Sequence, residues 1–188
     1  ILGMSRQGLR VGAAKVTGTG AGGDVYRMLD NGAVKVYDFT DCGYPSTYKV
    51  SLVDCIQIME TLIARLCEEN VDSIVIEVAD GILQKETRGL LLSPAFQELA
   101  DDIIFAAGEA MGALSGVEWL KSKGLNVVGA SGVLTSAPLA MREFSQYSEV
   151  PIYSREELKL GHFEGGRLDQ VEQSEQPSMA SNAMAKSA

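Results

Sequence analysis

Apolar residues follow two patterns along residues 1–163, one typical of strands and one typical of helices. Short runs rich in β-branched and other apolar residues occupy 9–16, 33–39, 73–79, 102–107, 125–130 and 150–153. Runs of this kind are typical of strands that are buried on both faces of a sheet. Helical patterns stand between them, and this alternation predicts an α/β protein with a mainly parallel central sheet.

Three of the helical segments carry a clear start signal. Apolar residues recur at intervals of three and four at Leu52, Ile56, Met59, Ile63 and Leu66, a stripe that should cover the sheet. Ser51 precedes this stripe and Ser93 precedes Pro94, so both serines are predicted to cap a helix. Ser154 and Glu157 have the spacing of a capping box.

The chain predicts one α/β domain over residues 1–163. Its 188 residues, 46% of them hydrophobic and 22% charged, suffice for one buried core. Residues 164–180 are polar and predict a flexible C-terminal tail. Residues 181–188 contain Ser-Asn-Ala before a methionine, which resembles the remnant of an expression vector, and placed ahead of Ile1 they would extend a helix ending at Gly8. We expect this segment to be N-terminal and out of order; a natural Ser/Ala-rich tail is the alternative.

Charge and hydropathy exclude several kinds of partner. The 16 Lys and Arg against 25 Asp and Glu give a formal net charge of -9, which would repel a nucleic-acid backbone. No apolar run approaches the roughly 20 residues that cross a bilayer, and the first residues lack the pattern of a secretory signal. We therefore expect a cytoplasmic protein with no nucleic-acid or membrane partner. The three widely spaced cysteines favour free thiols over disulfides or a zinc site.

Candidate catalytic and ligand-binding residues cluster where predicted strands end. Ligands of open parallel sheets bind beyond the carboxyl ends of the strands. Residues 15–24 carry Lys15 and four glycines, whose amides can approach an anion. Glu77 and Asp80 follow a second apolar run, an arrangement suited to binding magnesium or orienting water. Residues 131–136 are small and rich in hydroxyl groups, and they are a third candidate for lining a pocket.

These segments resemble motifs of one nucleotide-binding family. Lys15-Val16-Thr17-Gly18 is similar to a Lys-Pro-Val-x-[Ser/Thr]-Gly motif without its proline, and residues 77–81 partly match a Glu-Gly-Ala-Gly-Gly segment. Over residues 1–150 the chain thus resembles the P-loop NTPase superfamily, in the branch that contains dethiobiotin synthetase. The resemblance implies a three-layer sandwich that uses ATP and Mg²⁺. It implies a catalytic Lys15, magnesium bound by Asp24 and Glu77, and cofactor contacts from Thr17, Gly18, Gly20 and Gly22.

The family's main phosphate-binding motif is missing from the sequence. The 188 residues contain no Gly-x-x-x-x-Gly-Lys-[Ser/Thr] and no strand to precede it. We therefore expect a P-loop-like sheet without its first strand and phosphate-binding loop, either because the chain is truncated or because NTP hydrolysis has been lost. The sequence leaves two functional hypotheses. In the first, the intact protein is an ATP- and Mg²⁺-dependent enzyme that acts on a small metabolite. In the second, the chain is a noncatalytic module that binds a metabolite or a protein. Unpaired strand edges predict a homodimer.

Simpler explanations stand beside these roles. The glycines at 18–23 could form a plain turn, and Glu77 could be a structural carboxylate that accepts backbone hydrogen bonds. Asp80 is a candidate turn or cap residue. Asp38 and Asp41 belong to a segment that either closes over a substrate or forms a surface turn.

Overall fold

Within residues 1–161, which the computed structural model describes, five strands form two parallel sheets. The first sheet has the order β2-β1-β3 and the second pairs β4 with β5, and every pairing is parallel. The strands are β1 (Val11–Thr17), β2 (Ala33–Asp38), β3 (Ser73–Val78), β4 (Ile103–Ala106) and β5 (Val127–Ser131). The predicted α/β class is confirmed. The expected tail at 164–180 and the expected displaced segment at 181–188 lie outside the described residues.

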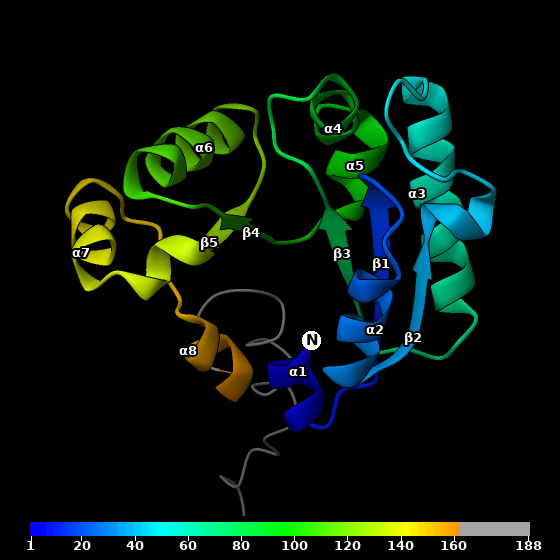
Figure 1. Ribbon diagram of the computed structural model, residues 1–188, viewed down its shortest axis with the longest axis horizontal. Helices are drawn as coiled ribbons and strands as arrows, with labels where there is room; N and C mark the ends of the chain where they lie inside the picture. The colour runs from blue at the N-terminus through cyan, green and yellow to red at the C-terminus, as the bar shows by residue number, and fades with distance from the viewer. Residues whose placement is uncertain (162–188) are drawn as a thin grey trace, which may run out of the picture.

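Helices connect the strands and cover the sheets (Figure 1). They are α1 (Leu2–Arg6), α2 (Gly22–Asp30), α3 (Leu52–Cys67), α4 (Lys85–Leu91), α5 (Pro94–Leu99), α6 (Ala110–Ser122), α7 (Pro138–Tyr147) and α8 (Arg155–Leu160). Two 3₁₀ turns, η1 (Phe39–Cys42) and η2 (Val133–Ser136), follow β2 and β5. None of the helices within residues 1–161 has both the length and the apolar character needed to span a bilayer.

The predicted helix starts are confirmed by their caps. The hydroxyl of Ser51 accepts the amide of Asp54 at the start of α3, and that of Ser93 accepts the amide of Phe96 in α5. Ser154 forms a reciprocal capping box with Glu157 at the start of α8. These side chains accept amide hydrogens that have no partner inside the helix, which is why each helix begins there.

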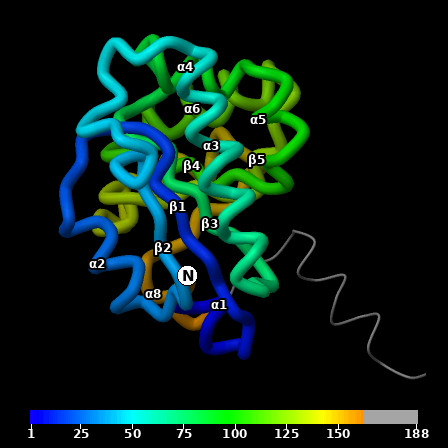
Figure 2. The backbone as a smooth tube through the Cα atoms, turned by 90° about the vertical axis from the view of Figure 1, so that its right-hand side faces the viewer, coloured from blue at the N-terminus to red at the C-terminus, as the bar shows by residue number. Residues whose placement is uncertain are grey.

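The buried face of α3 is rotated from the predicted stripe. Met59 and Leu66 are buried as expected, but Leu52 is 44% exposed. The remaining buried positions are Cys55, Ile58 and Leu62. The small residues of β1 allow α3 to approach closely, because a Cβ at Gly12 would lie 3.1 Å from a methyl of Leu66. All seven residues of β1 are buried, and α2 and α3 lie on opposite sides of the β2-β1 pair (Figure 2).

Residues 150–153, which the sequence predicts to be a strand, form only a single β-bridge in the structure. Ile152 forms a parallel bridge with Ala130 of β5, and the amide of Tyr153 donates to the Ala130 carbonyl over 2.9 Å. Pro151 has no amide hydrogen, so the ladder does not extend further in this direction. The bridge still fixes the chain against β5 before α8 begins.

An interval separates β3 from β4. Within residues 1–161, β3 pairs only with β1 and β4 pairs only with β5, so each of them has an open edge. Read across Figure 1, the order is β2, β1, β3, β4, β5, with no strand between β3 and β4. The sheet predicted from the sequence is therefore divided at this one position.

Candidate functional site

The ammonium group of Lys15 lies between two carboxylates at the carboxyl end of the first sheet. In the strand register Lys15 stands opposite Asp38 of β2 and Glu77 of β3. Lys15 as a whole residue is only 6% exposed to solvent. Nζ donates a hydrogen bond to Asp24 of α2 and lies 3.9 Å from Oε1 of Glu77. The fold thus brings together the three side chains that the sequence nominated for catalysis and metal binding.

Burial and neighbouring charges act in opposite directions on these groups. Burial lowers the pKa of the Lys15 ammonium, but the hydrogen bond to Asp24 and the charges of Glu77, Asp24 and Asp80 outweigh it, so this pKa is raised. Burial raises the pKa of Glu77, Asp24 and Asp80 raise it further, and the attraction of Lys15 only partly offsets them. Lys15 therefore carries its charge at neutral pH, surrounded by three acidic side chains.

The carboxylates of Asp24 and Glu77 offer oxygen atoms of the kind that Mg²⁺ prefers. In residues 1–161 no group of three or more acidic, cysteine or histidine side chains is arranged to hold a metal ion. Mg²⁺ is commonly held by one or two carboxylates together with phosphate oxygens, so this donor pair fits the ion only when a phosphorylated ligand completes the site. Here both carboxylates interact with the Lys15 ammonium instead.

The glycine-rich loop after β1 is fastened to residues 45–47. The amide of Gly18 donates to the hydroxyl of Thr47 over 2.8 Å, and the amide of Gly20 donates to the Pro45 carbonyl over 3.0 Å. The Gly18 carbonyl in turn accepts the amide of Thr47 over 2.9 Å. These two predicted phosphate donors are therefore engaged within the chain. Gly22 is the first residue of α2, where amides have no acceptor inside the helix.

Gly18 is required by its surroundings as well as by its backbone. Its φ of +118° lies in a region that side-chain-bearing residues rarely adopt. A Cβ at this position would lie 3.2 Å from Cε of Lys15 and 3.2 Å from Cβ of Ala79. The glycine therefore lets the loop pass directly beside the buried lysine.

The carbonyl of Ala79 joins β1, β3 and α4. It accepts the hydroxyl of Thr17 over 2.6 Å and the hydroxyl of Thr87 over 2.7 Å. Thr17, a predicted cofactor contact, is thus used to hold the segment that follows Glu77. Thr87 was not anticipated, because a single threonine inside a helix matches no motif. Thr47 was missed for the same reason: its bond to Gly18 spans 29 positions of sequence.

Two other predicted segments form turns. Asp38 accepts the amide of Thr40 over 2.8 Å, and Asp41 accepts the amide of Asp38 over 2.8 Å, a reciprocal cap that starts η1. This supports the interpretation of the segment as a turn. At the last residue of β5, the hydroxyl of Ser131 donates to the Tyr153 carbonyl over 2.8 Å, and in η2 the hydroxyl of Thr135 donates to the Gly132 carbonyl over 2.8 Å. These hydroxyl groups stabilise the chain locally.

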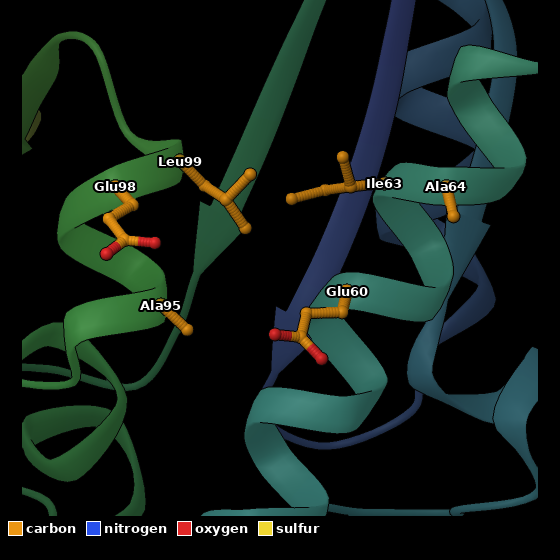
Figure 3. A pocket seen from close by; sticks show the side chains of 6 residues that line it. All are labelled: Glu60, Ile63, Ala64, Ala95, Glu98 and Leu99. Carbon is orange, nitrogen blue, oxygen red and sulfur yellow. The ribbon is translucent and has the colours of Figure 1, made fainter.

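Two cavities lie next to α3, apart from the charged cluster of Lys15, Asp24 and Glu77. One of about 310 Å³ lies between α3 and α5 (Figure 3). It is lined by Glu60, Ile63, Ala64, Ala95, Glu98 and Leu99. A second, of about 300 Å³, shares Ile63 and Leu99 and extends along Ile74 and Ile76 of β3. Neither cavity includes Lys15, Asp24 or Glu77, so neither is part of the charged cluster.

Comparison with known protein families and with curated proteins finds no match for this chain.

Proposed function

We propose that the intact protein is a P-loop-NTPase-like enzyme of the dethiobiotin-synthetase type, which uses ATP and Mg²⁺ to act on a small carboxylate or amine. The observation that carries this proposal is the meeting of Lys15, Asp24 and Glu77 at the carboxyl ends of parallel strands. Ligands of open α/β sheets bind at such ends because the loops converge there without disturbing the core.

Each of the three side chains has a role in this proposal. The charged, almost buried Lys15 neutralises phosphate or substrate charge. Asp24 and Glu77 hold Mg²⁺ directly or through water, and the bound ion supplies further positive charge to phosphate oxygens. Both carboxylates interact with the Lys15 ammonium, so binding of phosphate and Mg²⁺ at this site would replace the acidic partners of the ammonium.

The 188-residue chain alone is expected to hydrolyse ATP negligibly. It lacks the Gly-x-x-x-x-Gly-Lys-[Ser/Thr] motif, and its Gly18 and Gly20 amides donate to residues 45–47. Each charge-assisted hydrogen bond contributes roughly 1.5–3 kcal/mol. The absence of several phosphate donors together therefore weakens triphosphate binding by several powers of ten.

Isothermal titration with Mg²⁺ and ATP tests the proposal. The 188-residue chain is compared with a form extended by the in-frame coding sequence upstream. We expect binding only in the extended form, and Lys15→Met should weaken it at least tenfold. Lys35→Met is the matched control, because the ammonium of Lys35 lies 3.7 Å from the carboxylate of Glu69 but both side chains are about two-fifths exposed. Micromolar binding by the 188-residue chain, or an extended form indifferent to Lys15→Met, would refute the proposal.

The open edges of β3 and β4 favour a second candidate function. Unpaired strand edges recruit other chains, so a noncatalytic α/β module that binds a metabolite or a protein and forms a homodimer is the alternative. Analytical ultracentrifugation of the 188-residue chain over a range of concentrations tests it. A species that stays monomeric at high concentration contradicts the dimer.

A further inference from the structure

The first turn of α4 contacts the segment that engages the glycine-rich loop. In that turn the carboxylate of Glu86 accepts the backbone amide of Lys49 over 2.8 Å. We propose that Glu86 is a positioning residue, which fixes the backbone of Lys49 and thereby holds residues 45–47 against the loop. The amides of Gly18 and Gly20 stay engaged as a result. Only the use of these two amides as phosphate donors depends on the proposed function.

Lys49 has a backbone conformation that is unfavourable for a lysine. Its φ is +62°, in the left-handed region where glycine and asparagine are the usual residues. The amide of Val50 donates to the Thr47 carbonyl over 3.1 Å, so the chain makes a turn with Lys49 at its third position. Such a conformation persists only where the surroundings fix it, and the bond from the Lys49 amide to Glu86 does so. Loss of the Glu86 carboxylate therefore loosens this turn.

The position of this turn decides whether the glycine loop stays engaged. Thr47, the first residue of the turn, is only 3% exposed. Thr19 forms an antiparallel bridge with Ser46. The hydroxyl of Ser46 donates to the Gly18 carbonyl over 3.2 Å and accepts the amide of Tyr48 over 3.1 Å. Because a short two-stranded contact has little stability of its own, it depends on the turn that ends it.

α4 is placed to hold both parts of the candidate site. Thr87, the residue after Glu86, is 2% exposed, and its hydroxyl donates to the Ala79 carbonyl. A Cβ at Gly89 would lie 3.2 Å from Cδ1 of Leu52, so the glycine lets α4 approach the start of α3 closely. Two neighbouring residues of α4 thus have different tasks. Glu86 holds the turn beside the glycine loop, and Thr87 holds the segment that follows β3.

Amide hydrogen exchange of the 188-residue chain, followed by NMR without ATP, tests this role. Glu86→Ala should speed exchange of the Gly18 and Gly20 amides at least about tenfold, because a bond to a charged acceptor is lost. The amides of β1 should change less than about twofold. Glu86→Gln keeps an oxygen that accepts the Lys49 amide, so exchange should stay within about threefold of the original chain. This variant separates the hydrogen bond from the general benefit of an acidic residue in the first turn of a helix.

Glu60→Ala is the matched control, because Glu60 is an exposed glutamate of α3 that lines the cavity apart from the loop. It should leave exchange at Gly18 and Gly20 unchanged. Four results would overturn the inference: unchanged exchange in Glu86→Ala, a uniform rise that includes β1, a Glu86→Gln variant that behaves like Glu86→Ala, or an equal rise in Glu60→Ala. Loop amides that respond to Glu86→Ala in a protein whose extended form binds no ATP refute the proposed function alone. ATP binding by the extended form, with loop amides indifferent to Glu86→Ala, refutes the positioning role alone.

Discussion

Replacing Lys15 by methionine tests the buried charge cluster most directly. Methionine keeps much of the aliphatic volume and removes the ammonium that Asp24 and Glu77 share. At the 3.9 Å between Nζ and Oε1 of Glu77, the attraction is about 4 kcal/mol at an effective dielectric constant near 20. The carboxylate side chain is 39% exposed, so water reduces this value to about 2 kcal/mol. For a chain of this size the corresponding fall in Tm is roughly 4–8 °C.

The assay is a double-mutant cycle followed by urea and thermal unfolding at pH 7. Lys15→Met alone should be destabilising, and Glu77→Gln should stabilise the Lys15→Met variant more than it stabilises the unsubstituted chain, because without Lys15 the carboxylate of Glu77 is uncompensated. Lys35→Met serves as the surface control. Its ammonium lies 3.7 Å from Glu69, but both side chains are about two-fifths exposed, so the expected loss is below about 1 kcal/mol. The reasoning fails if both lysine variants lose the same stability or if the effects of Lys15→Met and Glu77→Gln simply add.

Three further substitutions probe the same end of the sheet. Glu77→Gln alone should raise the Tm near neutral pH, with the gain vanishing below about pH 4: the raised pKa of Glu77 means that the folded state holds the proton more tightly and loses stability as pH rises through that pKa. A gain that persists in acid would contradict this. Thr87→Val should cost about 1 kcal/mol in urea unfolding by removing one hydroxyl from the Ala79 carbonyl; an unchanged midpoint would show that this bond contributes nothing. Gly18→Ala should be more destabilising than Gly81→Ala, because both glycines have a positive φ but only Gly18 has close neighbours; equal losses would point to backbone conformation alone.

The positions of the strands could be predicted because they depend on local composition. The fully buried β1 combines Val11, Ala13 and Val16 in a short apolar run that has no helical stripe. The separation of β3 from β4 could not be predicted in this way, since strand pairing joins residues far apart in sequence. The rotation of α3 has a similar cause: Leu52 fits the helical stripe, but the position of β1 decides which face is buried.

At the candidate site, too, some features could be predicted from the sequence and others could not. Lys15 and Glu77 could be placed together because parallel strands end at one edge, and their register confirms this. That the Gly18 and Gly20 amides donate to residues 45–47 could not be predicted, because no sequence motif marks the contact between these two segments. Thr87 was missed because its importance arises only when α4 folds back onto the Ala79 carbonyl.

The attachment of the glycine loop to residues 45–47 has a kinetic consequence. A ligand that uses the Gly18 or Gly20 amide must wait until Thr47 or Pro45 releases it. If release precedes capture, the observed association rate rises with ligand concentration only until it reaches the rate of opening, and then becomes constant. The residues that hold this loop would then set the speed of recognition as well as its strength.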